Sequence, residues 1–166
     1  MKLPRLGLLA TVLVATLVSM ACGLSHSKWA DIHYSNGDGF SKQGLYEQAI
    51  KEYDKAIELN PTLAKAYVDR AAAYLQLGQF QQAIQDSDKA IQLDPAQALG
   101  YANRGRAYLG LGQLQQAIHD LDKAIELAPT LSGAYYIRGI ALQGFGQPEL
   151  AKQDRTRACE LNRKLC

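Results

Sequence analysis

The sequence repeats with a period of 34 residues, and this repetition restricts the possible folds more than any other feature of the chain. The two clearest copies are residues 64–97 and 98–131. They match at Tyr67 and Tyr101, Arg70 and Arg104, Tyr74 and Tyr108, Leu77-Gly78-Gln79 and Leu111-Gly112-Gln113, and Lys89-Ala90-Ile91 and Lys123-Ala124-Ile125. A fixed period of this length is the signature of an array of small helical units, each of which packs on its neighbours.

The period continues on both sides of this central pair. Ala49-Ile50, Lys55-Ala56-Ile57 and Pro61 precede the pair in register, and Tyr135, Arg138-Gly139, Gly146 and Ala151 follow it. The sequence therefore predicts four units that together form a domain over residues 30–166. Their bounds are residues 30–63, 64–97, 98–131 and 132–165.

Each unit has the pattern of two helices joined by a tight turn. In the central units, apolar side chains recur one or two helical turns apart. Gly78 and Gly112 fall where the first helix has to end, and glycine readily adopts the left-handed conformation found at helix ends. Pro61, Pro95 and Pro129 follow the second helix, which a residue without an N–H cannot continue. These patterns predict an all-α solenoid of helix–turn–helix repeats.

The two terminal units depart from this pattern. Gly37 and Gly39 are each unfavourable by about 1 kcal/mol inside a helix, so the sequence predicts a weak first helix. In the last unit, Pro148 stands where the central units have Phe80 and Leu114. Charged residues also replace apolar ones there, as expected for a terminal cap with a polar outer face.

The pattern resembles the tetratricopeptide repeat, a 34-residue helix–turn–helix unit. The third unit fills the positions of that motif with Tyr101, Gly105, Tyr108, Ala117, Leu121, Ala124 and Pro129. The second unit matches at the same positions except for Ser87 at the late aromatic position. The resemblance implies a right-handed superhelical solenoid. It also implies that the first helices of the units line a concave groove, which receives an extended peptide or a partner helix.

The resemblance further implies which residues line this groove. They correspond to Lys65, Val68, Asp69, Leu99, Asn103, Arg106, Tyr136 and Ile137, with Tyr34, Asp38, Ala72 and Ile140 beside them. Some members of the family hold a C-terminal carboxylate with a clamp of Lys, Asn and Arg side chains. The clamp positions here hold Tyr34, Asp38, Asp69, Leu99 and Asn103, so we expect no receptor for such a terminus.

Residues 1–21 have the layout of a secretory signal peptide. A basic start precedes an apolar run, and the small residues Ser19 and Ala21 lead to Cys22. A cysteine at this place resembles a bacterial lipoprotein signal, which implies cleavage before Cys22 and lipidation of this residue. The alternatives are a plain cleaved signal, which would give a secreted protein, and an uncleaved membrane anchor. Residues 22–29 would form a short tether to the first repeat.

Arginine recurs at one position of the repeat, and an acidic residue recurs at another. The arginines are Arg70, Arg104 and Arg138, and the acidic residues are Glu52, Asp86, Asp120 and Asp154. We expect these residues to form a ladder of ion pairs between units. The pairs Asp88-Lys89 and Asp122-Lys123 are expected to be solvated surface.

Two cysteines near the C-terminal end leave two possibilities open. Cys159 and Cys166 are seven residues apart, which is too far for a disulfide along one unbroken helix. They can pair only if the chain turns back after Leu161. Otherwise they remain free thiols.

Composition and motifs argue against catalysis, cofactors and nucleic-acid binding. The chain has 18 Lys and Arg against 16 Asp and Glu, and removal of Lys2 and Arg5 would balance these charges. A neutral chain with interleaved signs lacks the basic surface that nucleic-acid binding requires. The sequence has no metal-ligand spacing, phosphate-binding glycine loop or nucleophile motif. We therefore expect no enzyme activity, no cofactor and no metal.

These observations predict a protein-interaction adaptor or scaffold, tethered to a membrane of a bacterial cell envelope and facing the periplasm. Its partners would be proteins that the sequence does not identify. The resemblance implies relatives that act as adaptors for envelope proteases, peptidoglycan enzymes, or pilus and secretion assembly. Three alternatives are a self-associating structural protein such as a homodimer, a noncatalytic subunit of an envelope complex, and an enzyme.

Overall fold

The computed structural model describes residues 25–166, so the predicted signal peptide and Cys22 lie outside the described residues. Residues 25–166 contain α-helices and one short 3-10 helix, with no strand among them. The helices are α2 (His26–Lys42), α3 (Tyr46–Leu59), α4 (Ala64–Gln76), α5 (Phe80–Leu93), α6 (Ala98–Gly110), α7 (Leu114–Leu127), α8 (Ser132–Gly144) and α9 (Pro148–Leu161), followed by the 3-10 helix η1 (Arg163–Leu165). The all-α prediction is confirmed.

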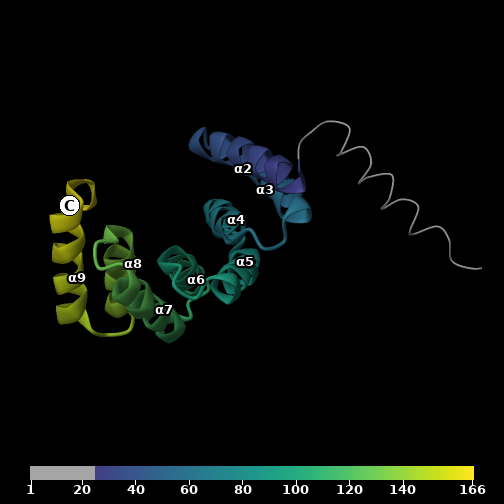
Figure 1. Ribbon diagram of the computed structural model, residues 1–166. Coiled ribbons are helices and arrows are strands. Elements are labelled where there is room, and N and C mark those ends of the chain that lie inside the picture. Colours follow the sequence, from purple (N-terminus) through teal and green to yellow (C-terminus); the bar gives the residue numbers. More distant parts are fainter. Residues whose placement is uncertain (1–24) are drawn as a thin grey trace, which may run out of the picture.

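The helices pack as four pairs that follow one another along an arc (Figure 1). α2 pairs with α3, α4 with α5, α6 with α7, and α8 with α9. The first helix of each pair also contacts the first helix of the next pair. The helices α2, α4, α6 and α8 therefore line the inner side of the arc, and the second helices form its outer side (Figure 1). The predicted solenoid of four helix–turn–helix repeats is confirmed.

The turn inside each unit is made by a glycine with positive φ. These glycines are Gly44, Gly78, Gly112 and Gly146, with φ of 76°, 71°, 73° and 83°. At the end of α4, the amide of Gln79 donates to the carbonyl of Tyr74 at 2.9 Å, and the amide of Gly78 donates to Leu75 at 3.3 Å. These hydrogen bonds satisfy the last carbonyls of the helix. The helix ends predicted at Gly78 and Gly112 are confirmed.

The two helices of a unit approach closely because a small residue faces a larger one. A Cβ atom added at Gly37 of α2 would lie 2.6 Å from the Tyr53 ring of α3. One added at Gly105 of α6 would lie 2.8 Å from Leu121 of α7. Gly37 is therefore the complement of Tyr53, and α2 is a continuous helix through the glycines that suggested weakness.

Each unit from the second to the fourth contains an arginine that joins three helices. Arg104 of α6 donates from Nε and Nη2 to the carboxylate of Asp120 on α7, at 2.7 and 2.8 Å. Its Nη1 donates at 2.6 Å to Asp88 on α5 of the preceding unit. These hydrogen bonds, chiefly the one to Asp120, raise the pKa of Arg104, so its charge is permanent. The same contacts join Arg70 to Asp86 and Asp54, and Arg138 to Asp154 and Asp122.

This three-helix bridge corrects the sequence analysis in two respects. The acidic partners predicted for the arginines lie in the same unit as the arginine, and the link between units is made by other carboxylates. Two of these, Asp88 and Asp122, were expected to be solvated surface, but each accepts a hydrogen bond from an arginine of the next unit. They come within reach because the second helix of one unit packs beside the first helix of the next.

The first unit has Asn36 at the arginine position, and its acidic residue belongs to a local cluster instead of the predicted ladder. Nδ1 of His33 lies 2.7 Å from Oε2 of Glu52, and Nζ of Lys55 donates to Oε1 at 2.6 Å. These hydrogen bonds, with that of His33 the largest influence, lower the pKa of Glu52 to about 2.

Helix α2 begins at His26, four residues before the predicted start of the first repeat. Residues 26–29, which the sequence analysis includes in the short tether, are therefore helical. Trp29 lies on this extra turn, with its ring centroid 6.4 Å from that of His33 one turn later.

At the other end of the arc, the chain turns back after α9 and Cys159 forms a disulfide with Cys166. Oδ1 of Asn162 accepts a hydrogen bond from the amide of Lys164 at 3.1 Å. Oδ1 of Asn60 makes the equivalent bond to Thr62 at 3.2 Å between the first two units. The turn that elsewhere leads into the next unit thus brings the cysteines together, with 4.9 Å between their Cα atoms. Of the two possibilities left open by the sequence, the structure shows the disulfide.

We predict that the two carboxylates bound by Arg104 differ widely in importance. The Asp120 side chain is 3% exposed, so Arg104→Met should leave a buried unpaired carboxylate and lower the free energy of unfolding by about 3–5 kcal/mol. The Asp88 side chain is 54% exposed, and Asp88→Asn should lower it by about 1 kcal/mol or less. Urea denaturation of both variants measures the difference. Equal losses would contradict this account of the bridge.

Candidate protein-interaction groove

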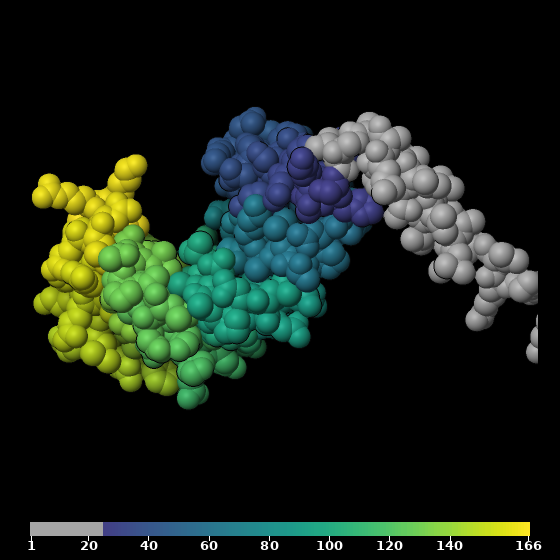
Figure 2. All heavy atoms as spheres, viewed as in Figure 1, coloured from purple at the N-terminus to yellow at the C-terminus, as the bar shows by residue number. Residues whose placement is uncertain are grey.

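The inner side of the arc is a hollow between the two ends of the array. In the space-filling view, the hollow lies between the purple atoms of α2 and the yellow atoms near the C-terminal end (Figure 2). The predicted groove residues belong to α4, α6 and α8, which line this side (Figure 1). The predicted residues thus all lie on inner helices, but they differ in how far their side chains are exposed.

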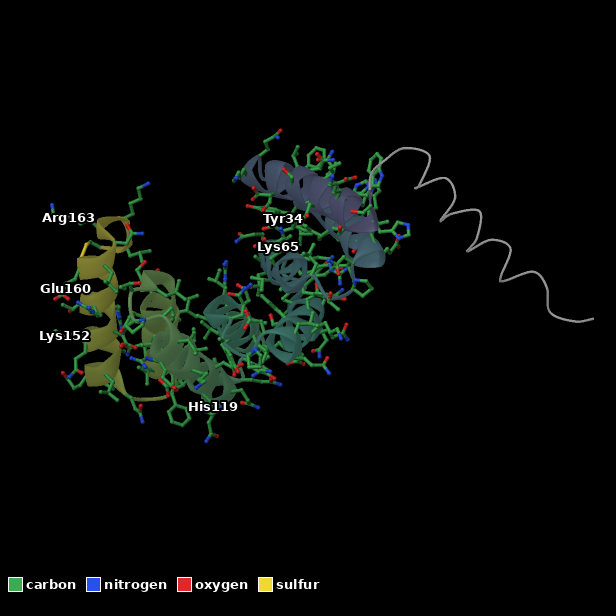
Figure 3. All side chains as sticks on the ribbon, viewed as in Figure 1. Tyr34, Lys65, His119, Lys152, Glu160 and Arg163 are labelled. Atoms are coloured by element: carbon green, nitrogen blue, oxygen red, sulfur yellow. A yellow bond between two sulfur atoms is a disulfide. The ribbon has the colours of Figure 1, made fainter. Side chains whose placement is uncertain are left out.

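The half of the groove nearer the N-terminal end is held by a polar network. Tyr34 of α2 donates its hydroxyl hydrogen to Oδ2 of Asp69 on α4, at 2.7 Å. Nζ of Lys65 lies 4.2 Å from the centroid of the Tyr34 ring and 3.2 Å from Oδ1 of Asp31. Figure 3 shows Tyr34 and Lys65 next to each other where α2 meets α4. These side chains join the first two units across the inner face.

Burial acts on both members of the central hydrogen bond in this network. It raises the pKa of Asp69, and the hydrogen bond from Tyr34 offsets part of this rise. Burial together with the neighbouring Asp69 carboxylate also raises the pKa of Tyr34. The tyrosine therefore remains a hydrogen-bond donor at physiological pH. One oxygen of the Asp69 carboxylate, Oδ2, already accepts a hydrogen bond within the protein and is less available to a partner.

Two further predicted groove residues also have structural contacts. Nδ2 of Asn103 on α6 donates to the backbone carbonyl of Val68 on α4, at 2.9 Å. Val68 itself is 3% exposed and packs in the core with Tyr67 and Ala90. Asn103 and Val68 therefore set the spacing between the first helices of two units and offer a partner little free surface.

The half of the groove nearer the C-terminal end is open and largely apolar. Leu99 of α6 is 45% exposed, and Tyr136 and Ile140 of α8 are 38% and 43% exposed. Ile137 is half-buried and packs against the core. Arg106 is exposed, and within residues 25–166 its guanidinium forms no hydrogen bond or ion pair. This surface can accept apolar side chains and one anionic group.

The positions of the carboxylate clamp carry the wrong charge for a C-terminal carboxylate. Asp69 is ionisable and half-buried, and Asp38 lies on the neighbouring helix, where it pairs with Lys42 at 2.6 Å. Leu99 is apolar, and Asn103 is committed to the Val68 carbonyl. A chain terminus at this place would meet two carboxylates and no free cation among the clamp positions.

Some of the clefts in the described part of the chain lie between the two helices of one unit. One is bordered by Arg104, Tyr108, Gln115, Gln116, His119 and Asp120, between α6 and α7. Its arginine and aspartate already bind each other, so it holds no unpaired charge that would favour an ion. Residues 25–166 contain no cluster of three or more His, Cys, Asp or Glu side chains placed to bind a metal. No helix among them has the length and apolar character to cross a bilayer.

Comparison with known families identifies the repeats. A family model described as TPR repeat matches residues 37–78 and 73–112, and one described as tetratricopeptide repeat matches residues 98–131. These matches extend over more than half of the chain. The chain belongs to the tetratricopeptide repeat family.

Several solved structures of tetratricopeptide repeat proteins are similar to this chain. The crystal structure of MamA has a TM-score of 0.71 and 28% identity, and the match covers 81% of this chain and 79% of MamA. The first TPR of Spaghetti (RPAP3) bound to the HSP90 peptide SRMEEVD has a TM-score of 0.70 and 29% identity, covering 72% and 95% of the two chains. TTC0263 from Thermus thermophilus has a TM-score of 0.74 at 22% identity and shows the fold alone.

Curated relatives match over a shorter stretch. Hsp70-Hsp90 organizing protein 3 of Arabidopsis thaliana is 42% identical over 48 residues, and Hsp70-Hsp90 organizing protein 1 of Glycine max is 46% identical over 50 residues. These stretches cover 29% and 30% of this chain but only 9% of either relative. Tetratricopeptide repeat proteins are generally non-catalytic adaptors for protein–protein interactions.

Sequence reasoning missed two groups of residues that shape the groove. Asp54, Asp88 and Asp122 recur with the period, and each precedes an arginine by the same 16 residues that separate this arginine from its second acidic partner. This constant spacing of 16 residues is a sequence signal that could have identified the three aspartates as partners of the arginines. The hydrogen bond between Tyr34 and Asp69 has no such signal, because it occurs at one junction only.

We predict that Asp69 makes the protein less stable as the pH rises. Because its pKa is higher in the folded protein, the contribution of Asp69 is fully present below the unfolded pKa and is lost as the pH rises through the folded pKa. Asp69→Asn removes this dependence, so the free energy of unfolding of the variant should rise relative to that of the wild type as the pH rises above the ordinary pKa of a carboxyl group. Tyr34→Phe should steepen the loss. Urea denaturation at several pH values tests both, and a constant difference for Asp69→Asn would contradict the assignment.

Proposed function

We propose that this tetratricopeptide repeat protein is a membrane-tethered adaptor of a bacterial cell envelope. It binds an extended peptide or a helix of a protein partner in its concave groove, without covalent chemistry. The observation that carries the proposal is the open surface formed by Leu99, Tyr136, Ile140 and Arg106 on the inner helices α6 and α8. This surface belongs to the inner helices, and its side chains form no hydrogen bond or ion pair within residues 25–166.

The chemistry of this surface indicates the kind of segment it accepts. Covering three half-exposed apolar side chains contributes about 1 kcal/mol for each. A carboxylate of the partner can pair with Arg106, which has no acidic partner within residues 25–166. We therefore propose an internal segment with apolar residues and one acidic residue. The clamp positions argue against a C-terminal carboxylate like that of the peptide bound by Spaghetti.

Tethering would compensate for the modest strength of such a contact. A few kcal/mol correspond to a dissociation constant in about the millimolar range. If both proteins are held at one membrane, the effective concentration reaches values of that order. The sequence of residues 1–22 supports the tether, with a signal peptide ahead of Cys22 and lipidation of Cys22.

We predict that variants of the open surface lose the partner. Arg106→Glu and Tyr136→Ser change exposed side chains and leave the contacts of Asp69 and Asn103 intact. A gentle-detergent pull-down from native envelopes, with mass spectrometry, should recover a protein with the wild type that is lost with either variant. The matched control is His119→Glu on α7, which Figure 3 shows on the outer side of the arc. A partner that survives both groove variants but not the control would move the site to the outer face.

We also predict that Cys22→Ser moves the protein from the membrane fraction to the soluble fraction, because the lipid would be absent. Fractionation of cells and immunodetection measure the shift. Retention in the membrane would reject lipidation and favour an uncleaved membrane anchor.

A further inference from the structure

The first repeat presents a face that every later repeat buries. At the position of Ile32, the later repeats have buried small residues, which are Ala66, Gly100 and Ala134. At the position of Gly39, they have Ala73, Ala107 and Ala141, which are at most 1% exposed. In the first repeat, Ile32 is 40% exposed, Trp29 is 36% exposed, and a Cβ atom added at Gly39 would meet nothing within 4 Å. We call Trp29, Ile32 and Gly39 the N-terminal edge.

Ile32 shows that this edge is not shaped to receive another repeat of the same kind. At the junction between the second and third units, a Cβ atom added at Gly100 would lie 3.1 Å from Cγ1 of Ile91. A full isoleucine side chain at that position would overlap the preceding unit. The last unit of a second copy has Cys159 at the position of Ile91, and the disulfide from Cys159 to Cys166 holds η1 against α9 at that end. Head-to-tail stacking of copies is therefore disfavoured.

The chain between Cys22 and α2 brings the edge close to the proposed anchor. Only residues 23–25 separate Cys22 from the start of α2, and they span at most about 14 Å. Trp29 lies about 5 Å further along the helix axis. A lipid at Cys22 would therefore keep Trp29 within about 20 Å of the membrane surface, even with the connecting residues fully extended.

We propose that the N-terminal edge rests on the lipid bilayer and orients the array, with Trp29 at the level of the headgroups and Ile32 toward the acyl chains. The indole ring is suited to this place because it combines an apolar body with an N–H donor. A single lipid chain binds a membrane only marginally, and a second contact beside it strengthens the attachment. The inference rests on the proposed function, since it needs the lipid at Cys22.

The charges around the edge are compatible with a lipid surface. Asp31 lies 3.2 Å from Nζ of Lys65, and Glu52 is bound by His33 and Lys55. The carboxylates on this side are thus matched by cationic groups. Lys28 is exposed beside Trp29 and can approach lipid phosphates.

This contact would leave the groove accessible. α2 and α9 form opposite ends of the arc, and the open surface on α6 and α8 lies between them (Figure 1). An array held by its first helix therefore presents its inner side to partners near the membrane. Attachment along the outer helices would not require an apolar N-terminal edge.

The single tryptophan of the chain makes the contact directly measurable. The mature protein, lipidated at Cys22, is reconstituted into vesicles of phosphatidylethanolamine and phosphatidylglycerol, and flotation measures the bound fraction. Trp29 emission should shift to the blue relative to protein in detergent-free solution. Lipids brominated near the headgroup should quench this emission more than lipids brominated deep in the acyl chains. Ile32→Ser should reduce the quenching, and Ile140→Ser, an equally exposed isoleucine on α8, should leave it unchanged.

A relocated tryptophan provides the matched control. Trp29→Phe/Phe145→Trp moves the probe to the exposed turn between α8 and α9, where quenching should be lost. Equal quenching at both places would mean that the whole arc lies on the membrane, and it would overturn the proposal. Flotation with an unquenched Trp29 would overturn the edge contact and leave the anchor standing. In that case, cross-linking of two copies through the N-terminal edge would show that this edge is a dimer interface. Absence of flotation would overturn both the anchor and the contact.

Discussion

The three-helix bridge made by Arg70, Arg104 and Arg138 is the interaction on which the rest of the structure depends. Each arginine fixes the two helices of its own unit through a buried aspartate and reaches the preceding unit with its remaining nitrogen. A tyrosine three residues earlier packs its ring about as closely on every one of these guanidinium groups, at 5.6–5.7 Å. Loss of the arginine would leave its buried aspartate unpaired and strongly destabilise the protein. Because one guanidinium binds both carboxylates, it fixes the packing of the two helices within a unit together with the spacing between units. The bridge stops at Asn36 in the first unit and at Thr156 in the last, where the sequence lacks the arginine or the aspartate.

The spacing imposed by the bridge also divides the groove into two parts with different roles. Where the first helices meet near the N-terminal end, Tyr34, Asp69 and Asn103 hydrogen-bond across junctions and hold the curvature. Further along, Leu99 on α6 and Tyr136 and Ile140 on α8 form no such hydrogen bond within the described residues, and they remain exposed. In a solenoid the stability comes from contacts between neighbours. A partner surface can therefore occupy only positions that those contacts leave free, and here these positions gather in one half of the arc.

The repeat period allowed much of the fold to be predicted from the sequence, and the failures have physical reasons. Helix ends at Gly78 and Pro95 depend on local backbone chemistry, which the sequence states directly. Gly37 suggested weakness because its helix propensity is visible in the sequence, whereas the Tyr53 ring that requires it lies on another helix. Asp88 looked solvated because its arginine belongs to the next unit. In the groove, all eight residues implied by the family resemblance lie on the inner helices. The resemblance could not separate Val68 and Asn103, which hold the array, from Leu99 and Tyr136, which are exposed, since burial depends on the packing of adjacent units.

Family membership determines the shape of the groove but not the charge of its ligand. The similar domain of Spaghetti binds the peptide SRMEEVD, whose C-terminal carboxylate would need cationic or amide donors at the bottom of the groove. Here Asp69 occupies the centre of the corresponding surface, and burial already makes its negative charge unfavourable, as the raised pKa shows. A second carboxylate in that place would repel it in a medium of low dielectric constant. Arg106, which has no acidic partner within residues 25–166, lies on the next inner helix, α6. These charges favour the proposed ligand, an internal acidic residue within an apolar segment, over a chain terminus.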